Sequence, residues 1–158
     1  MAAPAPVLNL LWEDWADKTL ALPAYATAGA AGADIRANLA LEMRRDGLVL
    51  EPGARALVPA GFRIEIAPGF EVQIRPRSGL ALKHGVSVLN APGTIDSDYR
   101  GPIGVLLVNH GSQDFVIAHG DRIAQMIVAR VVRARIELAK SLSASARGTG
   151  GYGSTGLG

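Results

Sequence analysis

The sequence predicts an all-β domain, either a sandwich or a barrel, on three observations. Apolar and polar residues alternate with a period of two over several short stretches, and turn residues separate one stretch from the next. The chain contains 19 glycines and 9 prolines, which favours many short segments over a few long helices. With 158 residues and 49% hydrophobic content, it can bury one substantial core, so we expect a single domain over residues 1–158.

The clearest strands lie in the stretch GFRIEIAPGFEVQIRP. Every second residue is apolar from Phe62 to Ile66, and again from Phe70 to Ile74. A Pro68-Gly69 turn lies between them. This pattern predicts two half-buried strands joined by a turn.

Further strands are expected in the second half of the chain. The stretches GVSVLN (85–90) and IGVLLVNH (103–110) are short and apolar, and the second is apolar on both faces, as in the interior of a sandwich or barrel. The stretch DFVIAHGDRIAQMIVARVVRARIEL (114–138) contains two more, separated by a turn at His119-Gly120-Asp121. Short strands at this spacing are typical of sandwiches and barrels.

Two stretches are candidates for a helix, GLALKHG (79–85) and the ambiguous LLWEDWADKTL (10–20), and we expect at most one short helix. Apolar residues give way to Ser, Ala and Gly at Ser143. The folded body is therefore expected to stop there, with a flexible glycine-rich arm over residues 143–158.

Composition excludes several classes of function. Lys and Arg number 16 against 14 Asp and Glu, and aromatic residues make up 5%, so we expect neither a basic surface nor a stacking platform for nucleic acid. The absence of cysteine excludes disulfides and thiolate chemistry. The N-terminal stretch MAAPAPVLNLLWEDW has no positively charged start and is broken by acids, so we expect a cytoplasmic protein with no membrane partner.

Two polar segments in the first half of the chain are candidates for binding. In AGADIRA, glycines allow tight turns before Asp34, whose carboxylate could serve a site or accept local amide bonds. In RPRSGLALKHG, Arg75 and Arg77 flank a proline, and Ser78-Gly79 opens a possible helix. Guanidinium groups, a hydroxyl and free amides suit phosphate oxygens, but two surface arginines and an ordinary serine cap would give the same sequence.

Two further segments lie in the second half. LNAPGTIDSDYRG forms a predicted hairpin with Pro92-Gly93 at its tip, followed by Asp96, Asp98, Tyr99 and Arg100. Carboxylates beside a cation can hold a metal, activate a water or satisfy one another. In GDRIAQMIV, Gln125 either bonds to backbone in the interior or faces a ligand.

The three histidines, His84, His110 and His119, show no metal-ligand spacing. We therefore expect no metal held by protein side chains. No local motif suggests a serine nucleophile with its histidine and acid either.

Taken in order, five segments resemble the five motifs of the trimeric dUTP pyrophosphatases (dUTPases), and the hairpin and the strand pattern are most similar to the bacterial branch. They are AGADIRA, RPRSGLALKHGV, GTIDSDYRGPIGV, GDRIAQMIV and RGTGGYGSTG, and the resemblance runs from about Leu22 to Gly156. It implies a jelly-roll fold and a homotrimer with sites shared between subunits. It also implies Mg²⁺-assisted hydrolysis of dUTP to dUMP and pyrophosphate, which limits uracil in DNA and supplies dUMP for dTMP synthesis.

The resemblance also implies residue roles. Asp96 would hold and deprotonate the attacking water, and Asp34 would play a supporting part. Mg²⁺ would be held mainly by the triphosphate and waters. The residues that would contact the phosphates are Arg77, Ser78, Gly79, Gln125, Arg147, Ser154 and Thr155. Those that would contact uracil or deoxyribose are Asn90, Gly93, Thr94, Ile95, Tyr99 and Tyr152, the last standing where the family usually has Phe.

Two alternatives remain beside this interpretation. A dCTP deaminase of the same fold would share much of the pattern, although the hairpin and the complete arm RGTGGYGSTG favour dUTP hydrolysis. A non-catalytic trimer that binds nucleotide and uses the arm as a tether is the second.

Overall fold

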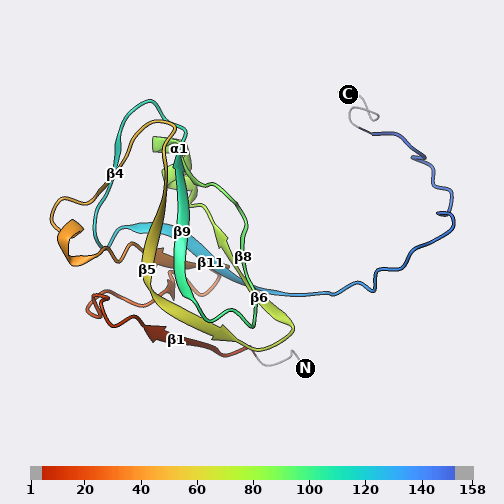
Figure 1. Cartoon of the computed structure of the whole chain (residues 1–158), viewed down its shortest axis with the longest axis horizontal. Helices are drawn as coiled ribbons and strands as arrows, with labels where there is room; N and C mark the ends of the chain where they lie inside the picture. Colours follow the sequence, from red (N-terminus) through yellow and green to blue (C-terminus); the bar gives the residue numbers. More distant parts are fainter. Residues whose placement is uncertain (1–4, 152–158) are drawn as a thin grey trace.

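The computed structural model describes residues 5–151 and shows a β-rich body from which the C-terminal segment extends (Figure 1). The strands are β1 (Leu8–Trp12), β2 (Ala24–Tyr25), β3 (Ala33–Arg36), β4 (Leu48–Leu50), β5 (Arg55–Ile66), β6 (Phe70–Arg75), β7 (Val86–Val88), β8 (Gly93–Ile95), β9 (Pro102–Asn109), β10 (Phe115–Ile117) and β11 (Arg122–Arg130). A 3₁₀ turn, η1 (Leu41–Met43), and one α-helix, α1 (Ser78–His84), complete the described elements. Within residues 5–151, no helix is long and apolar enough to cross a membrane.

The strands form two main sheets and one small one. The four-stranded sheet has the order β1-β5-β9-β7, and the five-stranded sheet has the order β2-β3-β11-β6-β8. Strands β10 and β4 form a separate pair. The strand pairings are antiparallel. The predicted all-β, jelly-roll-like class is confirmed.

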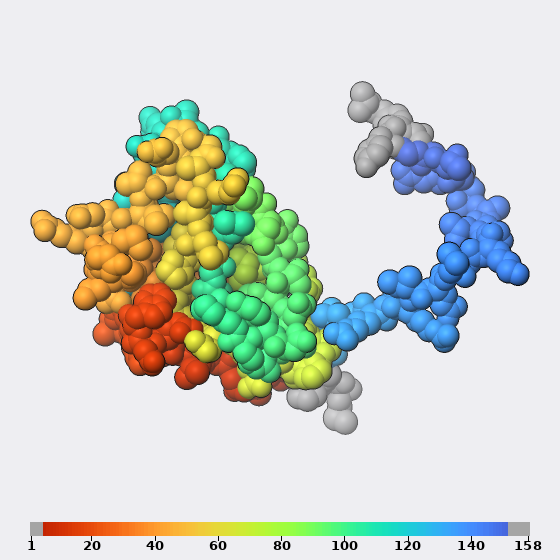
Figure 2. Space-filling view, viewed as in Figure 1, coloured from red at the N-terminus to blue at the C-terminus, as the bar shows by residue number. Residues whose placement is uncertain are grey.

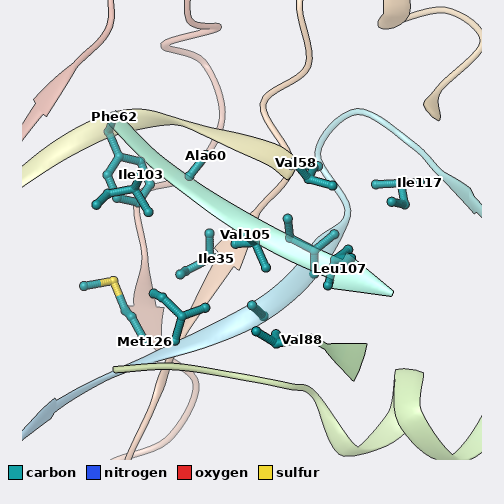
Figure 3. Packing of buried hydrophobic residues seen from close by; sticks show 14 of the residues in the cluster. Ile35, Val58, Ala60, Phe62, Val88, Ile103, Val105, Leu107, Ile117 and Met126 are labelled. Carbon is teal, nitrogen blue, oxygen red and sulfur yellow. The ribbon is translucent and has the colours of Figure 1, made fainter. Parts of the chain in front are cut away.

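The core lies between the two main sheets (Figure 3). From the four-stranded sheet, β5 and β9 contribute Val58 and Val105, both fully buried. From the five-stranded sheet, β3 and β6 contribute Ile35 and Val72, also fully buried. Each such side chain stabilises the fold by about 1.5–3 kcal/mol through removal of apolar surface from water.

The two strands predicted around Pro68-Gly69 are confirmed as β5 and β6, but they belong to different sheets. Gly69 has φ +88° and lies in a turn in which the amide of Phe70 donates to the carbonyl of Ala67 at 3.3 Å. The turn therefore carries the chain from one layer of the sandwich to the other.

The predicted hairpin at Pro92-Gly93 is wrong, because the strands before and after this turn do not pair with each other. Strand β7 before it pairs with β9, whereas β8 after it pairs with β6. The connecting residues turn sharply, with the amide of Ala91 donating to the carbonyl of Val88 at 3.2 Å. The physical reason is that Val86 and Val88 are buried in the other sheet, which separates β7 from β8.

Of the two helix candidates, GLALKHG forms α1 and LLWEDWADKTL does not form a helix. Helix α1 ends at His84 and is capped by Gly85, whose φ of +69° allows its amide to donate to the carbonyl of Ala81 at 3.0 Å. The other stretch begins with strand β1, in which Leu10 pairs with Ile64 of β5. Alternate residues of β1 pack against the core, so burial decides its conformation as a strand.

Strand β11 ends at Arg130, and residues 131–151 leave the body as an exposed, extended segment (Figure 2). The change of composition at Ser143 falls inside this segment. The arm over residues 143–158 stays a prediction, because its last part lies outside the described residues.

Candidate active site

Asp34 and Gln125 are brought together by strand pairing. Asp34 lies on β3 and Gln125 on β11, and the two are opposite one another in the antiparallel register. Gln125 also packs over Gly32, where a Cβ would lie only 3.2 Å from its Oε1. Two of the candidate residues, 91 positions apart in sequence, thus share one region of the sheet.

Arg77 joins Asp34 in an ion cluster that we call the Asp34 cluster, made of Asp34, Arg77 and Arg122. Arg77 Nε lies 3.3 Å from Asp34 Oδ1, and Arg122 Nη1 donates to Asp34 Oδ2 at 3.0 Å. Oδ1 is buried and accepts no hydrogen bond from the described residues, so its contact with Arg77 is an ion pair with poor hydrogen-bond direction. Arg77 Nη1 also donates to the backbone carbonyl of Arg122 at 2.9 Å.

Ser78 and Gly79 follow Arg77 directly and form the first turn of α1. Both are exposed, and a Cβ added at Gly79 would meet nothing within 4 Å. This surface beside the Asp34 cluster is open to an incoming ligand.

A second set of candidates lies at β8, one of the two edge strands of the five-stranded sheet. Gly93 is buried and pairs with Ile74 of β6. A Cβ at Gly93 would lie 3.3 Å from Asn90 Nδ2, which shows that the Asn90 side chain folds over this glycine. Asn90, Gly93, Thr94 and Ile95 are therefore neighbours in space.

A cavity of about 250 Å³ adjoins this edge and contains the predicted catalytic acid. It is lined by Leu57, Thr94, Ile95, Asp96, Tyr99, Pro102, Ile103 and Gly104. The Tyr99 ring lies over Gly101, and its hydroxyl donates to the carbonyl of Pro102 at 3.1 Å. Tyr99 thus presents a fixed aromatic surface on one side of the cavity.

The guanidinium of Arg100 is occupied by hydrogen bonds to its own loop and to Glu65 of β5. Its Nη2 donates to Glu65 at 3.0 Å, and its Nη1 donates to the carbonyls of Ser97 and Tyr99 at 2.7 and 2.9 Å. Among the described residues, Asp96 forms no ion pair. Its exposed carboxylate is therefore available to a ligand in the cavity.

Shifted pKa values occur among groups that join the N-terminal part of the chain to the body. The Thr19 hydroxyl and amide and the ring of His119 donate to Asp17 and lower the pKa of its carboxyl to about 2. Arg63, which holds Glu13 with two hydrogen bonds of 2.9 Å, lowers the pKa of that carboxyl. These ion pairs are structural and lie outside the two candidate sets.

Within residues 5–151, no three acidic, histidine or cysteine residues are grouped so that they could hold a metal ion. The carboxylate oxygens of Asp34 and Asp96 nevertheless suit hydrogen bonds from the water ligands that Mg²⁺ retains.

The structure keeps the candidate residues of one chain in separate places. Strand β6 lies between β8, with the cavity, and β11, with Gln125. The segment after β11 extends away from the body (Figure 1), and within it Arg147 Nε donates to the carbonyl of Gly150 at 3.0 Å. Tyr152, Ser154 and Thr155 lie outside the described residues.

Sequence reasoning gave no role to several residues at these places, among them Leu57 and Arg122. Leu57 of β5 lines the cavity, and no local pattern in its strand marks it as different from other apolar residues. Arg122 belongs to the motif GDRIAQMIV, but the sequence pattern assigns it no role in binding or catalysis. Its position directly after the His119-Gly120-Asp121 turn was the only available signal, and it does not reveal the contact with Asp34.

Comparison with known proteins agrees with this arrangement. The family model described as dUTPase matches residues 18–156. A deoxyuridine 5'-triphosphate nucleotidohydrolase from Roseobacter denitrificans is 62% identical over 150 residues, covering 94% of this chain and 95% of the relative. A protein of the same name from Dinoroseobacter shibae is 56% identical over 152 residues, covering 96% and 98%.

Solved structures with a similar fold are more distant in sequence. The Staphylococcus bacteriophage 80alpha dUTPase with dUPNHPP has a TM-score of 0.81 at 22% identity, covering 96% of this chain and 99% of that one. A mutant dUTPase from phage phi11 of S. aureus, described with a structural Mg(II) ion, has a TM-score of 0.70 at 18% identity, covering 87% and 99%. These support the fold, and the family model with the close relatives decides the family: the chain belongs to the dUTPase family.

Proposed function

We propose that this chain hydrolyses dUTP to dUMP and pyrophosphate by attack of water on the α-phosphate. The observation that carries the proposal is the cavity in which the free carboxylate of Asp96 lies beside the fixed ring of Tyr99 and the edge strand β8. Membership of the dUTPase family supplies the substrate class. Hydrolysis of free nucleotides also fits the predicted cytoplasmic location.

Recognition of uracil would use the backbone of β8. An edge strand presents amide and carbonyl groups on its unpaired side, and these can pair with the polar edge of a base. Asn90, which folds over Gly93, would add side-chain contacts from Oδ1 and Nδ2. A wrong base would leave such groups unpaired, and this penalty gives selectivity.

Discrimination at the sugar and activation of water would depend on two neighbours in the cavity. The Tyr99 ring, held by its bond to Pro102, would pack against deoxyribose and leave no room for a 2′-hydroxyl. The Asp96 carboxylate would accept a proton from the water. A carboxylate is a weak base, so its main contribution would be to place the water in line with the α-phosphorus.

The phosphates would lie against Arg77, Ser78 and Gly79, with Gln125 as a further polar contact. Arginine supports this role because its planar group binds phosphate oxygens by two parallel hydrogen bonds. Asp34 would support the same group through its contact with Arg77. When bound with the triphosphate, Mg²⁺ would neutralise charge on the phosphates.

A homotrimer would bring together the sets that one chain keeps apart. The segment after β11 has an apolar face on alternate residues, interrupted by Lys140. Val132, Ile136, Leu138 and Leu142 of this face are each at least 90% exposed. Charged residues such as Arg133 and Arg135 occupy positions between them. This pattern supports docking of the segment as a strand on a second copy, which would carry Arg147, Tyr152, Ser154 and Thr155 to a neighbour's site.

Hydrolysis of a nucleotide panel tests the proposal. The full-length chain is incubated with dUTP, UTP, dTTP or dCTP and Mg²⁺, and pyrophosphate and ammonia are measured. We expect pyrophosphate from dUTP and at most about a hundredth of that rate from the others. Ammonia release from dCTP would identify a deaminase instead, and nucleotide binding with no release of either product would identify a non-catalytic trimer.

A further inference from the structure

We propose that Arg122 is a positioning residue for nucleotide phosphates: it holds Asp34, which in turn fixes the guanidinium of Arg77. This inference rests on the proposed function, because it needs Arg77 to bind phosphate. Arg122 is not itself assigned a contact with substrate.

The contacts of Arg77 leave it one orientation. Its Nε faces Asp34 Oδ1 at 3.3 Å, and its Nη1 donates to the carbonyl of Arg122 at 2.9 Å. No hydrogen bond from Nη2 occurs within the described residues, so this nitrogen is available to a ligand. A guanidinium held on two sides loses less side-chain entropy when it binds phosphate.

Asp34 itself is held from the other side. Arg122 Nη1 donates to Oδ2 at 3.0 Å, while Oδ1 accepts no hydrogen bond from the described residues. Without Arg122, this mostly buried carboxylate would keep only its contact with Arg77, and both its position and that of Arg77 would loosen.

Charge balance gives Arg122 a second effect. A carboxylate beside a lone arginine would cancel the charge that attracts an anionic ligand. With Arg122 present, the Asp34 cluster has two cations and one anion, and a net charge of about +1 remains. Asp34 can therefore orient Arg77 without neutralising the region.

An irregularity in β11 makes the contact possible. The pairing of β11 with β3 shifts between Arg122 and Ala124, and the consecutive residues Ile123 and Ala124 are both fully buried. In a regular strand, residues 122 and 125 would face opposite sides of the sheet. The bulge places Arg122 on the same outer face as Gln125 and next to Asp34.

Ligand affinity tests the inference most directly. In the full-length chain, Arg122→Met, Arg122→Lys and the matched surface control Arg45→Met are compared by calorimetry for binding of dUPNHPP and dUMP. Arg45 pairs only loosely with Asp46, at 4.0 Å, and both are exposed. We expect Arg122→Met to weaken dUPNHPP binding about tenfold and dUMP binding less than twofold, since dUMP lacks the β- and γ-phosphates.

Two further comparisons separate positioning from other roles. Arg122→Lys should recover affinity for dUPNHPP to within about threefold, because Arg122 uses a single donor to Asp34 and lysine keeps the charge. In an Asp34→Asn background, Arg122→Met should change affinity by no more than about twofold, since the link to Arg77 is already broken. Additive effects would mean that Arg122 acts on phosphate directly and would overturn the inference.

The remaining outcomes are also decisive. Equal loss of dUPNHPP and dUMP affinity would show a general structural role, and unchanged affinity would show no role; either result overturns the inference. If Arg122→Met does not fold, Arg122→Gln gives the same comparison with a polar side chain. Wild-type hydrolysis of dUTP is measured first, because its absence would refute the proposed function irrespective of Arg122.

Discussion

The sandwich body and the segment after β11 have the same alternating sequence pattern but opposite burial. In the body, Val58 and Val105 are fully buried between two sheets of the same chain. In the segment, Ile136 and Leu138 alternate with charged residues in the same way and are fully exposed. Alternation therefore specifies an apolar face, but a second surface is required to bury it, and for the segment we infer that another copy supplies that surface.

The residues proposed for the chemical step and those proposed to close the site lie on these two different parts of the chain. Asp96 and Tyr99 lie in a cavity that the body forms by itself. Arg147 lies on the segment, and among residues 5–151 its side chain bonds to the carbonyl of Gly150 in its own turn. On this view the body contains the reacting groups, and the segment completes the site of a neighbour.

The largest effect is expected from Asp96→Asn, a change confined to the body. The amide keeps the shape of the carboxylate but cannot accept the proton of the attacking water. The rate constant kcat should fall about a thousandfold, with the affinity for dUPNHPP changed less than about threefold. Single-turnover kinetics and calorimetry measure these two quantities.

Because Asp96 is exposed and has no ion pair within the described residues, the variant should keep the melting temperature of the wild type. A variant that fails to fold would identify Asp96 as a structural acid. Unchanged kcat would remove it from the mechanism.

Two truncations should separate the functions of the segment. A chain that stops after Ala146 loses Arg147 and the glycine-rich end, but it retains the apolar face of residues 132–142. It should remain trimeric and lose about a hundredfold in kcat/KM for dUTP, because the phosphates lose a charge-assisted contact and the site stays open. A chain that stops after Arg130 should lose the trimer as well.

Analytical ultracentrifugation and the dUTP assay together test this pair of truncations. Normal turnover by the chain ending at Ala146 would reduce the arm to a passive tail. A trimer formed by the chain ending at Arg130 would show that the apolar face of the segment has no part in assembly.

The strands could be predicted because their cause is local. Period-two alternation identified β5 and β6, a short run apolar on both faces identified β9, a turn signal marked the start of β11, and bounding glycines identified the helix. The partition into sheets could not be predicted in this way. A Pro-Gly turn has the same local sequence when it closes a hairpin as when it crosses between layers, as at Pro68-Gly69.

The same difference between local and non-local causes applies to the residues of the candidate site. Arg77 and Asp34 were found because their polar segments stand out in an apolar chain, and their roles came from resemblance to a family. Arg122 was missed because its contact depends on the bulge in β11. A bulge is a property of the pairing between two strands, and the periodicity of a single strand does not show it.

The smallest effect is expected at the other end of the body, where Asp17 ties the N-terminal connection to the core through His119 and Asn38. Hydrogen bonds from Thr19 and His119 lower the pKa of Asp17 to about 2, below the ordinary 3.8. A lowered pKa means that the folded state favours the carboxylate, so its stabilisation is complete above about pH 4 and is lost as the pH falls through about 2.

Asp17→Asn should therefore lower the melting temperature by roughly 2–4 °C at pH 7, and the difference from wild type should vanish near pH 2. The exposed Asp46→Asn serves as control and should show no such pH dependence, and the truncated chain ending at Ala146 should respond to Asp17→Asn as the full chain does. A constant difference at all pH values would mean that the side chain's shape, and not its charge, stabilises this connection.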